Sequence, residues 1–163
     1  MSKLLDKRGQ VATDDPWRAA GAEQSDAHTE EYIFLPAACW REHGGVLDTD
    51  VHGLLLTGED EPMALATLLS RIKHAAIQFP VFSDGRGFSL ACILRGQLEY
   101  SGTLRAVGHI IPDQIFSLIR CGFDTFEISC DTEEQALMTF IKPFNVTYQA
   151  CLEYPEPLFR RRI

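Results

Sequence analysis

The 163-residue chain lacks the short motifs that identify most nucleotide-dependent and hydrolytic enzymes. It contains no Gly-x-Gly-x-x-Gly, no Walker loop, no serine-centred nucleophile elbow and no metal-binding pair of histidines. These absences exclude the easily recognised dinucleotide, nucleotide and hydrolase interpretations. We predict no metal site, and the motifs leave the cofactor unassigned.

The chain also lacks a Cys-x-x-Cys pair, the spacing that zinc ribbons and many iron–sulfur proteins share. Because free cysteine packs like a small hydrophobic residue, we interpret the thiols as reduced and mostly buried. The alternative gives Cys121 or Cys130 a redox role. The five cysteines are Cys39, Cys92, Cys121, Cys130 and Cys151.

Positive charge is scarce in this sequence. The chain holds 15 lysines and arginines against 23 aspartates and glutamates, a formal net charge of -8. This balance argues against a nucleic-acid partner, because such binding depends mainly on Lys and Arg that neutralise phosphates. No window approaches the roughly 20 apolar residues that cross a bilayer, and residues 1–10 lack the apolar segment of a secretory signal. We therefore expect a cytoplasmic protein with no nucleic-acid or membrane partner.

Residues 1–31 are predicted to form a weakly ordered N-terminal arm, and residues 32–163 a single α/β domain. The stretch 11–31 is polar, shows no sustained apolar period and holds only Trp17 as a large hydrophobic residue. An isolated aromatic residue in a polar arm often docks on a folded surface. We therefore expect Trp17 to pack on the domain or on a partner subunit.

Apolar segments alternate with helix signals from residue 32 onward. Pro62, Pro112 and a capping box at 132–135 each mark the beginning of a helix. This alternation predicts a parallel sheet, because right-handed βα crossovers join parallel neighbours. An open sheet and a half barrel are both compatible with it, and a half barrel would pair as a homodimer to hide its open edges. The expected strands are 32–35, 52–56, 75–82, 103–107 and 125–129.

One stretch, residues 82–89, combines glycine, arginine and a helix start, and we name it the arginine corner. Gly85 and Gly87 flank Arg86, so the backbone can bend close to a bound group while the guanidinium reaches over it. The helix that begins here turns free N–H groups toward the same place. The alternative is that Asp84 caps the helix and pairs with an exposed Arg86. The predicted anion-binding residues are Ser83, Arg86, Gly87 and Ser89.

Further candidates follow the neighbouring strands. Loops at the carboxyl ends of parallel strands share one rim, so Asp113 and Gln114 should lie near the arginine corner and contribute to the ligand site. His109 and Asp84 are the candidate catalytic acid and base, the alternative being a surface histidine without a task. The segment 120–124 should face away from the rim, with Arg120 near the end of its helix. The rim should also hold Ser129, Asp131 and Thr132.

Several motifs resemble one bacterial family in their order and spacing: Phe82-Ser83-Asp84-Gly85-Arg86-Gly87-Phe88-Ser89, Leu104-Arg105-Ala106-x-Gly108, Asp113-Gln114, Arg120-Cys121-Gly122-Phe123-Asp124 and Phe159-Arg160-Arg161. The family is catalogued as domain of unknown function 934. Its members are often labelled oxidoreductases of sulfite reduction, because they occur beside sulfite reductase and sulfate-assimilation genes. The likeness runs from about residue 32 to the C-terminus and implies no particular catalytic residue. His109 stands where the family is expected to have an acidic residue.

The residues and the resemblance lead to three functional hypotheses. The first is an auxiliary protein or minor oxidoreductase of assimilatory sulfite reduction that binds sulfite, sulfate or a phosphate group at the arginine corner. The second is a non-catalytic docking module for sulfite reductase, favoured by the missing cofactor motifs. The third is a half-barrel isomerase or lyase acting on a phosphorylated metabolite. Residues 160–162, three consecutive arginines, would be a solvated tail or would bind an acidic partner.

Overall fold

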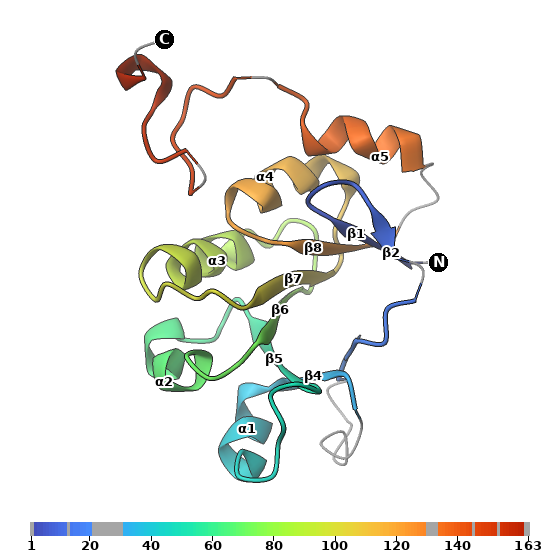
Figure 1. Ribbon diagram of the computed structural model, residues 1–163, viewed down its shortest axis with the longest axis vertical. Coiled ribbons are helices and arrows are strands. Elements are labelled where there is room, and N and C mark those ends of the chain that lie inside the picture. The colour runs from blue at the N-terminus through green and yellow to red at the C-terminus, as the bar shows by residue number, and fades with distance from the viewer. Residues whose placement is uncertain are drawn as a thin grey trace.

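The computed structural model describes residues 2–12, 14–20, 31–129, 134–144, 146–152 and 154–161. Within them, five βα units follow one another (Figure 1). No helix in these ranges has the length and hydropathy that a membrane span requires. The units are β4 (Ile33–Pro36) with α1 (Ala37–His43), β5 (His52–Thr57) with the 3₁₀ helix η2 (Pro62–Leu65) and α2 (Ala66–Leu69), β6 (His74–Phe79) with α3 (Arg86–Gly96), β7 (Thr103–Gly108) with η3 (Pro112–Gln114) and α4 (Ile115–Arg120), and β8 (Thr125–Ser129) with α5 (Glu134–Ile141).

The parallel strands stand in the sheet in the order in which they occur in the chain, from β4 to β8. With right-handed crossovers, this sequential order places every connecting helix on the same face. Figure 1 shows α1 to α4 in one layer beside the sheet. A curled sheet with one helix layer is a half barrel. The predicted α/β class with a parallel sheet is confirmed, and the half barrel is the one of the two architectures that forms.

Alternate strand positions build two separate apolar clusters. The larger cluster lies between the sheet and the helices, and includes the fully buried Leu54, Leu56 and Ile77. The smaller cluster lies on the face that the helices leave free. Because both faces are apolar, the strands read as continuous hydrophobic runs instead of alternating ones. The smaller cluster consists of Phe34, Leu55, Ala76 and Val107.

Trp17 covers the smaller cluster. Its ring lies 4.8 Å from that of Phe34 and 4.6 Å from that of His74, measured between centroids. Asp15 beside it forms an ion pair with the buried Arg105. The short strand β3 (Arg18–Ala19) then pairs with β4. The expected docking of Trp17 on the domain is confirmed, and residues 14–20 take the place of a second helix layer.

The first residues differ from the predicted weakly ordered arm. The strand β1 (Ser2–Asp6) pairs antiparallel with β8 and with β2 (Val11–Ala12), so that the sheet has eight strands within the described residues. Leu5 is fully buried in this arrangement. A polar segment gives little local strand signal, and its partner strand lies near the other end of the chain. Residues 21–30 lie outside the described ranges, so the domain boundary at residue 31 stays a prediction.

Candidate functional site

In the arginine corner, Arg86 is bound to carboxylates of its own chain. Oδ1 of Asp84 accepts hydrogen bonds from the backbone N–H of Arg86 at 3.1 Å and from its Nε at 3.0 Å, and Oδ2 accepts one from Nη2 at 2.8 Å. Nη1 lies 3.5 Å from Oε1 of Glu59. The hydrogen bonds from Arg86 hold the pKa of Asp84 below its ordinary value. This geometry matches the alternative in which Asp84 pairs with an exposed Arg86.

Gly87 is explained by packing. A Cβ atom at this position would lie 2.6 Å from Cζ of Phe79 and 3.1 Å from Cγ2 of Ile77. The helix α3 can therefore approach β6 this closely only because residue 87 has no side chain. At Gly85, by contrast, a Cβ atom would meet nothing within 4 Å. The glycine at 87 thus has a structural reason that needs no ligand.

The loops at the carboxyl ends of β6 and β7 converge, as parallel strands require. The backbone N–H of His109 donates to the carbonyl of Phe79 at 2.8 Å. Gln114 joins the two loops, since its Nε2 donates to the carbonyl of Phe82 at 2.8 Å and its Oε1 accepts from the N–H of Ile111 at 3.2 Å. The predicted convergence is confirmed for the loops after β6 and β7. The side chain of Gln114 is engaged in bracing these loops.

The other rim candidates point into solvent. Ser83, Ser89, His109 and Asp113 are exposed. None of these four side chains makes a hydrogen bond or ion pair with another residue of the described ranges. Asp131, Thr132 and the side chain of Ser129 lie outside the described part of the structure. The ligand and catalytic roles assigned to the rim from the sequence therefore stay predictions.

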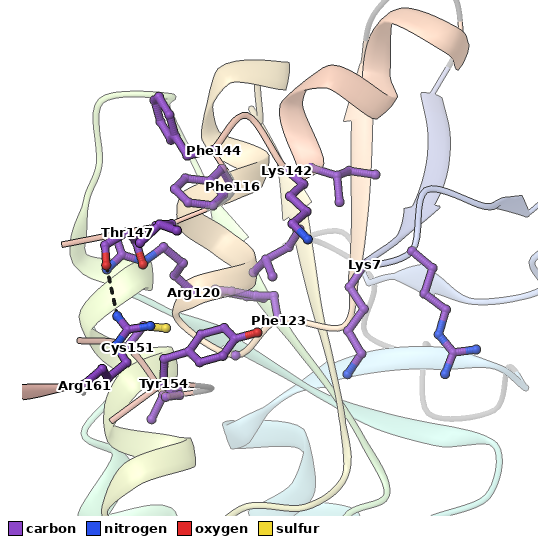
Figure 2. A pocket seen from close by; sticks show the side chains of 16 residues that line it. Lys7, Phe116, Arg120, Phe123, Lys142, Phe144, Thr147, Cys151, Tyr154 and Arg161 are labelled. Carbon is purple, nitrogen blue, oxygen red and sulfur yellow. Dashed lines mark hydrogen bonds between the residues drawn. The ribbon is translucent and has the colours of Figure 1, made fainter. Parts of the chain in front are cut away.

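A second candidate site is a cavity of about 590 Å³ at the other ends of the strands, away from the arginine corner, and we name it the basic cavity. Its walls come from the turn after β1, the end of α4 with the loop into β8, and the segment from 141 to 161 (Figure 2). Because β1 runs antiparallel to β8, its turn lies beside the loop that enters β8. The 16 lining residues are Lys7, Arg8, Phe116, Ile119, Arg120, Gly122, Phe123, Ile141, Lys142, Phe144, Val146, Thr147, Cys151, Leu152, Tyr154 and Arg161.

Two arginines of the basic cavity are held by uncharged groups. Nη2 of Arg120 donates to the carbonyls of Gln149 and Ala150 at 3.1 and 3.2 Å. Nη2 of Arg161 donates to the carbonyl of Thr147 at 3.0 Å, the contact that is dashed in Figure 2. Carbonyl groups fix the position of a guanidinium but leave its net charge in place. The cavity therefore keeps two positioned positive charges.

The remaining cations of the basic cavity are Lys7, Arg8 and Lys142. Lys7 is paired with Asp124, with 2.9 Å between Nζ and Oδ1. Arg8 and Lys142 form no side-chain hydrogen bond or ion pair with any residue that the structure describes. Figure 2 shows Lys7 and Lys142 on the same side of the cavity, facing Arg120 and Tyr154. Three of the five cations are thus held in place, and the other two are available to a ligand.

Aromatic rings supply the apolar wall of the basic cavity. Phe116 and Phe144 pack edge to face with 5.9 Å between centroids. The guanidinium of Arg120 lies 5.6 Å above the ring of Phe116, and that of Arg161 lies 5.5 Å above Tyr154. A cation over an aromatic face is attracted by the ring quadrupole. Rings and charges therefore alternate around one space, which suits a ligand with both an anionic and a planar part.

Comparison with known families decides where this chain belongs. The model of the family described as "Bacterial protein of unknown function (DUF934)" matches residues 53–159, more than half of the 163 residues. The chain belongs to this family. Neither the comparison with curated proteins nor that with solved structures gives a match. The resemblance seen in the sequence is confirmed at the level of the DUF934 family.

Most of the basic cavity of this DUF934 protein lies within the matched span, while Lys7, Arg8 and Arg161 lie outside it. Sequence reasoning assigned Arg120 to a helix end, and the structure does place it in the last turn of α4. The cavity itself was missed, because the rule for parallel sheets directs attention to the opposite rim. The available signal was the recurrence of basic residues beside aromatic ones at the chain end.

A second cavity of about 540 Å³ lies on the face of the sheet that carries Trp17. Its lining combines Arg18 with Asp15 and Glu127, and Gln78 reaches it from β6. Asp15 is already paired with Arg105. Charges of both signs leave no net preference for an anion, so the basic cavity is the stronger candidate site of the DUF934 protein.

Proposed function

We propose that this protein is an accessory protein that binds a small anionic ligand in the basic cavity. The observation that carries this proposal is the convergence of five cationic side chains on one cavity, while the lining residues that the structure describes include no acidic one, in a chain of net charge -8. A local cluster of positive charge on a protein of negative net charge raises the concentration of anions at that cluster.

The size and lining of the cavity narrow the ligand class. Ligand pockets of about 300 to 1,000 Å³ hold small molecules and cofactors, and the basic cavity, at about 590 Å³, falls within that range. Guanidinium groups suit the oxygens of sulfate, sulfonate, phosphate and carboxylate. The rings of Phe116, Phe123 and Tyr154 add planar apolar surface. The ligand we propose therefore carries an oxyanion joined to an apolar or aromatic body.

A binding role is favoured over catalysis by the lining groups. General acid–base catalysis most often uses His, Asp or Glu within reach of the substrate, and the lining residues within the described part of the chain include none of these types. The family resemblance suggests a place beside sulfite reduction, so sulfite, sulfate and a nucleotide are the first ligands to test.

Titration calorimetry on the full chain at low salt tests the proposal. Sulfite, sulfate and adenosine 5′-monophosphate are titrated, with uncharged adenosine as the ligand control. We expect at least one anion to bind, adenosine to bind far more weakly, and the double variant Arg8→Ala/Lys142→Ala to lose about 100-fold in affinity, roughly 10-fold for each charge.

The matched control variant is Arg86→Ala, which removes the guanidinium of the arginine corner and leaves the basic cavity intact. We expect its affinity to equal that of the wild type. Loss of binding in Arg86→Ala with full binding in the double variant would move the ligand to the arginine corner. Absence of binding by every anion tested would overturn the proposal.

The C-terminal segment favours docking on another protein as a second function. Phe144, Tyr148 and Phe159 are 62%, 68% and 67% exposed, unusually high values for aromatic side chains on one stretch. Aromatic residues are enriched at the centres of protein interfaces. We propose sulfite reductase as the partner to test first. A purified-component pull-down should recover it with the wild type and fail with Tyr148→Ser/Phe159→Ser, and recovery by both proteins would contradict this role for the segment.

A further inference from the structure

Three thiols gather beside the basic cavity. Cys92 lies on the exposed side of α3, Cys121 follows the last residue of α4, and Cys151 lines the cavity. Cys92 contributes to the raised pKa of Cys121, which indicates that the two side chains are neighbours. Nothing in the proposed binding function uses these groups.

Close packing of two side chains on Gly122 holds the three segments together. A Cβ atom at Gly122 would lie 2.6 Å from Cγ of Arg95 and 3.0 Å from Cδ1 of Leu152. Nε of Arg95 also donates to the carbonyl of Gly122 at 2.9 Å. Arg95 stands one helical turn after Cys92, while Gly122 and Leu152 are the chain neighbours of Cys121 and Cys151. The segments that carry the three thiols are thus brought together by contacts that do not involve sulfur.

We propose that Cys92 and Cys121 are an oxidation site at which a hydroperoxide forms a disulfide between α3 and the end of α4. Cys92 is the residue oxidised first, because it is the exposed member of the pair. Cys121 is the resolving thiol. The flanking residues Arg120 and Gly122 both line the basic cavity, so the bond forms directly against it.

The chemistry balances with one hydroperoxide per disulfide. The sulfur of Cys92 attacks the peroxide and becomes a sulfenic acid, and the first water or alcohol leaves. The sulfur of Cys121 then attacks the sulfur of Cys92, its proton goes to the departing hydroxyl, and a second water leaves. Two thiols are oxidised by two electrons and the peroxide is reduced by two.

The environments of the two thiols assign these roles. Burial, with a further contribution from Cys92, raises the pKa of Cys121 to about 12. A thiol that stays protonated at neutral pH is a poor first nucleophile toward peroxide. It can still attack a sulfenic acid held next to it, because proximity replaces intrinsic reactivity. Cys39, whose pKa is also raised by burial, serves as the isolated comparison cysteine.

Peptide mapping of the full-length protein tests the site. The reduced protein is treated with hydrogen peroxide, free thiols are blocked, and the chain is digested without reductant by trypsin and a glutamate-specific protease. Cleavage after Glu127 separates Cys121 from Cys130. Cleavage after Glu153 separates Cys151 from the residues that follow it. We expect one linked pair, the peptide of Cys92 with residues 121–127, and a fall from five titratable thiols to three.

Serine variants make the assignment specific. Cys92→Ser and Cys121→Ser should each abolish the link, while Cys39→Ser and Cys130→Ser should keep it. Far-UV circular dichroism and the melting temperature show whether each variant is folded. A link from Cys121 to Cys151, a link between two copies of the chain, or five free thiols after treatment of the folded wild type would each overturn the proposal.

Discussion

The arginine corner and the basic cavity both contain arginine near glycine, but only in the arginine corner is the arginine charge compensated by carboxylates. Arg86 meets Asp84 two residues earlier and Glu59 across the loop, so its charge is matched within the chain. Arg120 and Arg161 meet carbonyl oxygens and aromatic rings, which position a cation without neutralising it. An arginine is thus available to an external anion according to its partners and not according to its motif.

The difference also concerns why glycine is present. At Gly87 the absence of a side chain lets α3 pack on β6, whereas at Gly122 it makes room for Arg95 and Leu152. Gly122 has a φ of 91°, a left-handed conformation that suits the end of α4. Each glycine shapes the backbone around the neighbouring charged residues.

The largest effect should come from Gly87→Ala. The added methyl group would press on Phe79 and Ile77 in a fully packed core, so we expect the free energy of unfolding to fall by about 2 kcal/mol. Gly85→Ala is the matched control, and it should change stability by less than about 0.5 kcal/mol. Urea denaturation followed by circular dichroism measures both. Equal stability of the two variants would contradict the packing explanation and return Gly87 to the ligand site.

A smaller effect is expected from Arg120→Ala in the basic cavity. The variant loses hydrogen bonds to two carbonyls and the contact with Phe116, which should cost about 1 to 2 kcal/mol. It should also loosen the segment at 149–150. Hydrogen exchange of the amides of 146–152, compared with Arg120→Lys, measures this loosening. Unchanged exchange in Arg120→Ala would show that the segment is held by other contacts.

The rate of disulfide formation should depend on pH. Because the pKa of Cys121 is raised to about 12, its reactive thiolate is scarce at neutral pH and increases as pH rises toward that value. We expect closure from a preformed Cys92 sulfenic acid to become about tenfold faster per pH unit between pH 7 and 9. Stopped-flow mixing with thiol counting follows it. A rate independent of pH would contradict the assignment of Cys121 as resolving thiol.

The smallest effect should be the acid sensitivity of the arginine corner. The pKa of Asp84 is lowered in the folded state by Arg86, so the pair stabilises the protein above pH 3.8 and is lost as pH falls through the lower folded value. The melting temperature of the wild type should exceed that of Asp84→Asn at pH 6, and the difference should shrink below pH 3.8. A constant difference across this range would show that the pair contributes nothing.

The sequence predicts the repeated βα units well because each one carries its own signals. The apolar strand His52–Thr57 and the helix signal at Pro62 are local patterns. The strand Ser2–Asp6 could not be predicted in this way, because its burial depends on pairing with Thr125–Ser129. Leu4 and Leu5 alone do not indicate a strand when that partner strand is not known.

The two candidate sites also differ in whether the sequence predicts them. Convergence of the loops after β6 and β7 follows from parallel strands, so the proximity of Gln114 to the arginine corner was predictable. The basic cavity was not, because it gathers residues such as Arg8, Arg120 and Lys142 from segments with no common local pattern. Whether Arg86 is free or paired also depends on Glu59, which belongs to another loop.

The strand order has a consequence for how the chain reaches this shape. From β4 to β8 each new strand adds beside the one made just before it, so the sheet can grow stepwise as the polypeptide leaves the ribosome. The first strand, β1, is the exception, because its hydrogen-bonding partner β8 is synthesised much later. The wall of the basic cavity that carries Lys7 and Arg8 therefore cannot close before β8 has formed. The wall from residues 141–161 is synthesised after β8, so a binding-competent molecule exists only once both walls are in place.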